Sequence, residues 1–157
     1  MAMNEAQLTA LVQAVLARKA NLFSLTKMET VIAAAVKRAS ELDVGVTIAI
    51  MRNDQVVQMS YHMPNANLVS SQLAPKKAWS ALAMQQSTID LSQQVQPGEE
   101  LYQIETMMTG QLTSFGGGIP LEVDGEVIGA IGVSGGTVAQ DQEICEVAVK
   151  TFMKESR

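Results

Sequence analysis

Hydrophobic residues recur at intervals of three and four along the first quarter of the chain. This spacing places side chains on one face of an α-helix, so the pattern predicts two helices. The first apolar stripe consists of Leu8, Leu11, Val12, Val15 and Leu16, and the second of Met28, Val31, Ile32, Ala35, Ala39 and Leu42. Residues 1–22 are expected to form an extra N-terminal helix, either a detachable arm or an oligomerising helix.

After residue 45 the pattern changes to short β-branched segments separated by turn residues. Segments 46–51 and 56–61 flank a polar tetrapeptide, and segments 119–123 and 126–134 flank Asp124-Gly125. Asp-Gly between two apolar runs is typical of the tight turn of a β-hairpin. We therefore predict two antiparallel hairpins, and we expect residues 112–114 to add a further strand.

Helical spacing returns between and after the hairpins. It covers residues 66–86, with an expected break or new first turn at Pro75, and then residues 89–95 and 99–108. A final helix is predicted to begin at Thr137, with an inner face of Ile144, Cys145, Ala148 and Phe152. The element order α-α-β-β-α-α-β-β-β-α predicts an α+β fold in which helices pack on an antiparallel sheet.

Length and charge narrow the class of protein. The 157 residues suit one domain over residues 1–157, and a net charge of −5 without a run of Lys or Arg disfavours nucleic acid as a partner. No apolar segment is long enough to cross a membrane, and the N-terminus lacks the order of an export signal. We expect a cytoplasmic protein that binds neither membrane nor nucleic acid.

The chain lacks the side chains that the common catalytic arrangements require. His62 is the only histidine and Cys145 the only cysteine, so a nucleophile–base pair or a zinc site built from protein ligands alone has too few members. Cys145 lies on the apolar face of the final helix, where a thiol usually serves as packing. The sequence therefore predicts no catalytic residue and no metal site, and it favours a binding protein over an enzyme.

Glycines cluster in two segments of the last third of the chain. Gly116, Gly117 and Gly118 follow Phe115, and residues without Cβ leave an open surface for a flat ligand or for another strand. Gly135 and Gly136 lead into the final helix, whose free N–H groups can receive a carboxylate or phosphate. The alternative for this second pair is a tight turn that requires glycine.

Two polar side chains complete the candidate ligand site. One of two adjacent lysines on a predicted helix, Lys76 or Lys77, is a candidate to face an acidic group of a ligand, and the alternative is that both are solvated. His62 directly follows a predicted strand. It is a candidate to hydrogen-bond a ligand or to ligate iron or cobalt, and the alternative is an ordinary side chain at the end of a strand.

Several motifs in fixed order resemble the GlcG/HbpS-like family of heme-binding or heme-degrading domains. They lie at residues 74–81, 96–98, 116–121, 125–136 and 140–141. The first two also look like the C-terminal domain of PduO-type corrinoid adenosyltransferases, a domain separate from the one that carries the transferase activity. The resemblance extends from about residue 25 to the end of the chain.

The resemblance implies a profilin-like, three-layer fold with a five-stranded antiparallel sheet, self-assembly into dimers or larger rings, and heme, another tetrapyrrole or a corrinoid as ligand. Lys77, Gly116–Gly118 and residues 132–136 match the family pattern. Some relatives use a histidine of the first family helix as iron ligand. Residues 26–43 contain none, which leaves His62 as a conjectural iron ligand.

We therefore predict a homo-oligomeric module that binds a small ligand and is accessory to diol, glycerol or glycolate utilisation. The predicted ligand-binding residues are His62, Lys77, Phe115, Gly116, Gly117, Gly118, Gly135 and Gly136. Two alternatives stay open. One is a heme-modifying enzyme with Lys77 as a desolvated amine, and the other is a structural or assembly partner of a dehydratase system.

Overall fold

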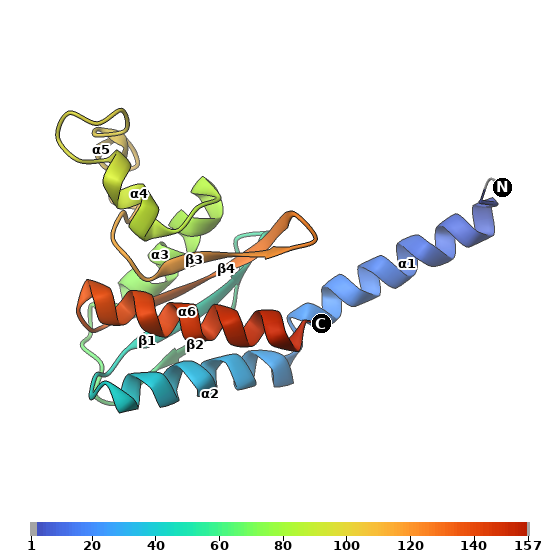
Figure 1. Ribbon diagram of the computed structural model, residues 1–157, viewed down its shortest axis with the longest axis horizontal. Helices are drawn as coiled ribbons and strands as arrows, with labels where there is room; N and C mark the ends of the chain where they lie inside the picture. The colour runs from blue at the N-terminus through green and yellow to red at the C-terminus, as the bar shows by residue number, and fades with distance from the viewer. Residues whose placement is uncertain (1–2, 157) are drawn as a thin grey trace.

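An antiparallel sheet forms the centre of the molecule and carries helices on both faces (Figure 1). The computed structural model describes residues 3–156. The sheet has the order β2-β1-β4-β3, with strands β1 (Thr47–Arg52), β2 (Val57–His62), β3 (Gly118–Val123) and β4 (Glu126–Ser134). Within the described residues it has four strands, so the expectation of a five-stranded sheet is wrong.

Both predicted hairpins are present, and they meet at the centre of the sheet. β1 pairs with β2, β3 pairs with β4, and β1 and β4 pair with Thr47 opposite Ser134. Asp124 and Gly125 have φ angles of 53° and 77°, the left-handed pair that the tight turn between β3 and β4 requires. Local turn chemistry therefore determines the hairpin of β3 and β4.

The strand expected at residues 112–114 is absent, and these residues have no regular secondary structure and lie outside the sheet. The Thr113 N–H donates to Ser80 Oγ at 2.8 Å, and Leu112 packs with Leu91 and Val95 of the neighbouring helical segment. Because its hydrogen bond and its apolar contact both go to helices, this segment does not extend the sheet.

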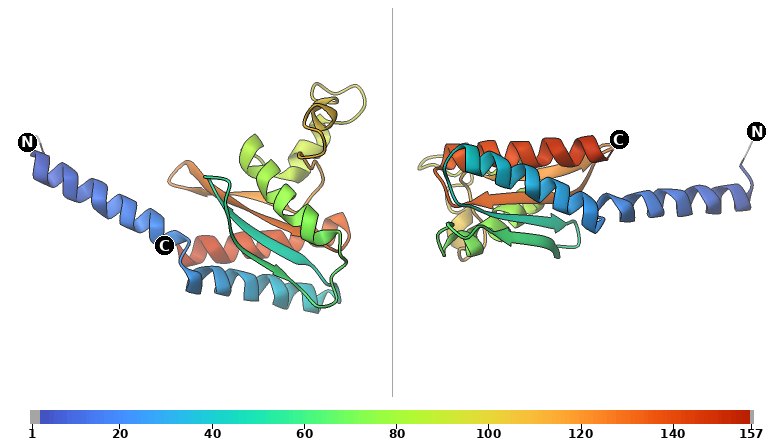
Figure 2. Two further views of the ribbon diagram at one scale, coloured as in Figure 1. Left: turned by 180° about the vertical axis from the view of Figure 1, so that it is seen from behind. Right: turned by 90° about the horizontal axis from the view of Figure 1, so that it is seen from below.

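The helices complete three layers (Figures 1 and 2). α2 (Leu25–Glu41) and α6 (Val138–Glu155) lie side by side on one face, and α3 (Ser70–Met84) covers the other. The short helices α4 (Thr88–Gln94) and α5 (Ile104–Met107) follow α3 and reach beyond the edge of the sheet. α3 is continuous, so the break expected at Pro75 is wrong.

The two faces of the sheet are packed differently. Ile48, Ile50, Ile131 and Val133 pack with α2 and α6 in the larger core, which includes the predicted inner face of the final helix. Small residues line the contact between the other face and α3, including Ala78 and Ala81 of α3 and Ala130 of β4, which allow this helix to lie close to the strands. This close approach positions the side chains described below.

α1 (Glu5–Leu22) projects away from the sheet and its covering helices (Figures 1 and 2). A capping box between Asn4 and Gln7 begins it, and its apolar stripe is exposed, with 46% of Val15 and 60% of Leu16 accessible. Residues 1 and 2 of the expected N-terminal helix, and residue 157 of the expected domain, lie outside the described residues. Among the helices described, none has the length and apolar character needed to span a membrane.

Candidate functional site

Lys77 is the largest fully buried side chain among the described residues, and it forms an ion pair between α3 and α6. Its Nζ donates to Asp141 Oδ2 at 2.8 Å and to the Val133 carbonyl at 3.0 Å. The Lys77 side chain has no accessible surface, and that of Asp141 is 4% accessible. The pair therefore joins α3, the end of β4 and the first turn of α6 inside the protein.

Asp141 also holds the second glycine segment in place. Its other oxygen, Oδ1, accepts the Gly136 N–H at 2.8 Å, just before the capping box of Thr137 and Gln140 begins α6. The sequence analysis did not select Asp141. The signal in the sequence was an acidic residue in the first turn of a capped helix, but nothing in the sequence paired it with Lys77.

Phe115 covers the lysine from the remaining side. Its ring centroid lies 4.8 Å from Lys77 Nζ, and 38% of Phe115 is exposed. An ammonium group has three hydrogens. Two are donated to oxygen atoms, and the aromatic face neighbours the amine as a cation–π partner. Lys77 is therefore satisfied by the chain's own atoms and is not solvated.

The glycines after Phe115 are buried beneath this cluster. A Cβ on Gly117 would lie 2.4 Å from the Val133 carbonyl oxygen and 3.0 Å from Lys77 Nζ, and one on Gly118 would lie 2.4 Å from the Lys77 carbonyl oxygen. A Cβ on Gly116 would meet Val138 and Gln142 of α6. The expected open surface at these glycines is wrong, because the close approach of α3 and α6 fills it.

Electrostatics at the buried pair act in two directions. Burial lowers the pKa of Lys77, and the hydrogen bond and charge of Asp141 oppose this effect. Burial also raises the pKa of the nearby Cys145 thiol above its usual range, which keeps this thiol protonated. The cluster is therefore suited to holding three elements together rather than to presenting a reactive group.

His62 belongs to a separate polar network at the end of β2. Ser70 Oγ donates its hydrogen to the Asn67 carbonyl at 2.6 Å, so the 2.7 Å bond between Thr47 and Ser70 must be donated by Thr47 Oγ1. Thr47 then accepts a hydrogen bond from His62 Nδ1 at 2.7 Å. In neutral His62 this arrangement leaves Nε2 as a free acceptor on an exposed side chain.

The predicted ligand residues thus fall into two neighbouring groups. Lys77 and Gly136 bond to Asp141, and Phe115 and Gly116–Gly118 lie against Lys77 or α6. Gly135 joins the other group, since its carbonyl accepts from the Asn67 side chain at 3.1 Å, and Asn67 also contacts Ser70 in the His62 network. Within residues 3–156, no three His, Cys, Asp or Glu side chains come together as a metal site.

Residues 23–150 match the family described as "Haem degrading protein HbpS-like". The chain belongs to the HbpS-like family. It is 45% identical over 126 residues to the corrinoid adenosyltransferase PduO of Citrobacter freundii, an alignment that covers 80% of this chain and 38% of that protein. The chain therefore spans less than half the length of this relative.

Two further comparisons cover most of the HbpS-like region. An uncharacterized 15.0 kDa protein from the dhaT-dhaS intergenic region of Citrobacter freundii is 35% identical, over 73% of this chain and 81% of that protein. A solved structure described as a PduOC:heme complex is 44% identical, with a TM-score of 0.79 over 82% of this chain and 93% of that one.

The first helix of the HbpS-like region is α2, and a groove that the sequence analysis did not identify runs between α2 and the edge strand β2. Its volume is about 470 Å³. It is lined by Glu29, Ile32, Ala33, Val36, Met59, Ser60 and Tyr61. The sequence shows the helical spacing of the α2 residues and the alternation of Met59 and Tyr61 on β2. It does not show that these residues line one groove, because that depends on how the helix and the strand pack.

Proposed function

We propose that this HbpS-like domain binds a heme-type tetrapyrrole in the groove between α2 and β2. The family description and a solved relative described as a heme complex both point to this class of ligand. The groove volume of about 470 Å³ lies within the range of about 300–1,000 Å³ that small-molecule sites occupy.

The apolar lining of the groove is the observation that carries this proposal. Ile32 and Val36 line it from α2, and Met59 and Tyr61 line it from β2. A flat, largely apolar ring system placed between helix and strand removes these side chains from water, which is favourable by about 25 cal/mol for each Å² of apolar surface.

Tyr61 is the proposed iron ligand. A tyrosine oxygen ligates heme iron in some proteins, and Tyr61 is 41% exposed at the groove. Met59 also carries a donor atom, but it packs against the main core. Tyr61 would take the role that a histidine of the first family helix has in some relatives.

His62 is the alternative iron ligand, and it lies outside the groove between α2 and β2. Its free Nε2 is suited to iron, and Leu68 and Val69, which directly precede Ser70 of its network, are 84% and 57% exposed. The His62 side chain bonds to Thr47 on the face of the sheet toward α3, whereas Met59 packs on the face toward α2. The two locations can therefore be separated by substitution.

Hemin titration followed by the Soret absorbance tests both the function and the location. We expect a saturable shift for the wild type and for Tyr102→Phe, a control at the only other tyrosine, which lies outside the groove. Tyr61→Phe should bind at least tenfold more weakly, and His62→Ala should bind as the wild type does. Loss of binding in His62→Ala alone would place the iron at His62. A wild type without a saturable shift would refute the proposed function.

An enzymatic role finds less support. Lys77 would be the amine of a heme-modifying enzyme, but it is enclosed and hydrogen-bonded within the chain. The proposal therefore assigns no catalytic residue.

The assembly and pathway of the domain are further parts of the proposal. We infer a homo-oligomer, with a corrinoid as the alternative ligand, that supports diol, glycerol or glycolate utilisation. The names of the PduO relative and of the dhaT-dhaS intergenic protein support this context. The absorption spectrum of the purified protein tests the bound ligand and its native mass tests the assembly state, and a monomeric mass would contradict the homo-oligomer.

A further inference from the structure

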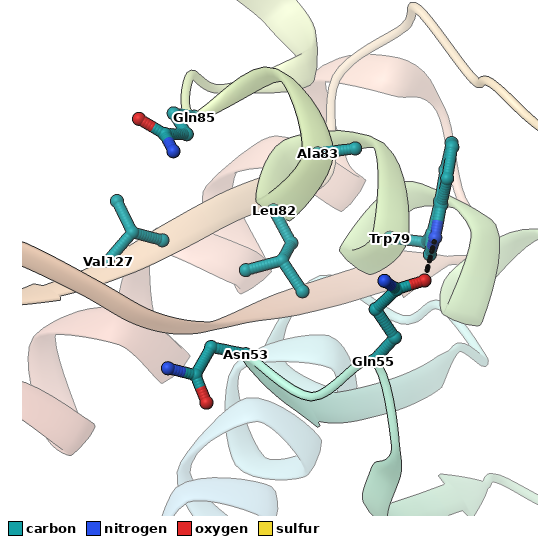
Figure 3. Close-up of a pocket in the computed structure, with 7 residues that line it drawn as sticks. All are labelled: Asn53, Gln55, Trp79, Leu82, Ala83, Gln85 and Val127. Atoms are coloured by element: carbon teal, nitrogen blue, oxygen red, sulfur yellow. Dashed lines mark hydrogen bonds between the residues drawn. The ribbon is translucent and has the colours of Figure 1, made fainter.

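A smaller pocket lies beside the turn that joins β1 and β2 (Figure 3). Its volume is about 260 Å³, and it is formed by the turn between β1 and β2, the second half of α3 and the beginning of β4. The lining residues are Asn53, Gln55, Trp79, Leu82, Ala83, Gln85 and Val127. On β4, Val127 is six residues from Val133, which corresponds to roughly 20 Å along a strand.

The lining combines three carboxamides with an indole and an apolar floor. Asn53 and Gln55 lie on one side, Leu82 lies in the middle, and Gln85 lies near Val127 (Figure 3). None of the seven lining residues carries a charge. A carboxamide offers both donors and acceptors, which is what a hydroxyl group needs because it donates and accepts at the same time.

Two of the carboxamides are held by unusual backbone conformations. Gln55 and Gln85 have φ angles of 67° and 52°, in the left-handed region that glutamine rarely adopts. The Trp79 indole N–H donates to Gln55 Oε1 at 3.1 Å, shown as the dashed line in Figure 3. This bond fixes the Gln55 amide and leaves its NH₂ group available as a donor.

We propose that this pocket binds a small, uncharged polyhydroxy compound of the size of a monosaccharide or a short polyol. The carboxamides would hydrogen-bond the hydroxyl groups, and the Trp79 ring would cover the apolar C–H face of the ligand. At about 260 Å³ the pocket is smaller than the groove of about 470 Å³ to which the tetrapyrrole is assigned. The lining contains no cation to select an anion.

The charged residues next to the pocket do not alter its preference for an uncharged ligand. Arg52 and Asp54, which flank Asn53 in the turn, form an ion pair with each other. Their charges are therefore matched outside the pocket, and the ligand meets neutral groups. This inference is independent of tetrapyrrole binding, since the two sites share no lining residue.

Trp79 is the only tryptophan of the chain and lines the pocket, so the fluorescence of the protein responds to changes there. D-glucose, D-galactose and glycerol are titrated separately into the full chain, with ligand-observed NMR as a second readout that does not depend on the indole. We expect at least one of them to produce a saturable change with a dissociation constant of about 1 mM, the range that ligands of this size reach.

The variants distinguish this pocket from other surfaces. Asn53 and Gln55 lie in an exposed turn, so the double variant Asn53→Ala/Gln55→Ala should fold, and it should bind at least tenfold more weakly by NMR. Gln72→Ala, which removes an exposed carboxamide of α3 outside the pocket, should bind as the wild type does. No saturable change with any probe up to about 50 mM, some fifty times the expected dissociation constant, would overturn the proposal. Full binding by the double variant would overturn it as well.

Discussion

Among the individual residues, Lys77 has the most unusual environment, because lysine side chains are usually exposed to water and this one is fully buried. Removing an ammonium ion from water is costly unless it is paired and hydrogen-bonded, and here Asp141, the Val133 carbonyl and the Phe115 ring provide the compensation. The pair contributes to folding only while both members are present, because either charge alone would be buried without a partner.

Substituting Lys77 tests this dependence. Lys77→Met should lower the free energy of unfolding by about 3–5 kcal/mol, because it leaves the Asp141 carboxylate buried and unpaired. Asp141→Asn, which keeps the acceptor for Gly136, should also destabilise the protein. The double variant should cost about 1–3 kcal/mol less than the sum of the single changes. Urea unfolding followed by circular dichroism measures all three.

Lys76→Met is the matched control for this cycle. The Lys76 amine donates to the Gly110 carbonyl and lies closer to solvent, so its loss should change stability by about 1 kcal/mol or less. Additive costs for Lys77→Met and Asp141→Asn would show that the two charges do not depend on each other.

At the scale of elements, α3 and β4 approach so closely at Gly132 that only glycine fits at this position. A Cβ on Gly132 would lie 2.0 Å from the Ala74 carbonyl oxygen and 2.7 Å from the Ala78 nitrogen, both backbone atoms of α3. The backbone of a helix cannot move aside as the end of a flexible side chain can, so the distance between α3 and the sheet is determined here.

Gly132→Ala should therefore lower the free energy of unfolding by about 3 kcal/mol or more, since α3 must shift away from the sheet. Gly110→Ala is the control. Gly110 has open space around it and a φ of 76°, so this substitution should cost only about 1 kcal/mol for the backbone conformation. Equal losses for the two variants in thermal unfolding would mean that α3 accommodates the methyl group.

Packing between distant elements also explains which features could be predicted from the sequence and which could not. The hairpins, the capping box of α6 and its inner face depend on residues a few positions apart, and all three were predicted. The partner of Lys77 lies 64 positions away, so the sequence alone could not show which of the two adjacent lysines is buried. The glycine segments indicated close approach but not its partner, and both cavities are formed only when distant elements pack together.

At the scale of the whole molecule, the described chain consists of the three-layer body and the projecting helix α1. The residues that match the family begin at Phe23, where α1 has just ended. Leu22 and Phe23 are buried, and the Phe23 ring lies 5.4 Å from that of Phe152 on α6. This contact attaches the arm to the body, while the described side chains before Leu22 are exposed.

Because Leu22 and Phe23 attach the arm to the body, two truncations that differ by three residues should have different unfolding temperatures. A variant that begins at Asn21 should unfold at the same temperature as the full chain, because the described side chains it lacks have no packing partners in the body. A variant that begins at Ser24 also loses Leu22 and Phe23, and the cavity this leaves should lower the unfolding temperature by about 10 °C or more. Calorimetry at one protein concentration measures both changes. If the variant that begins at Asn21 already showed most of the decrease in unfolding temperature, this prediction would be wrong. The apolar stripe of α1 would then have to be packed in a folded interface.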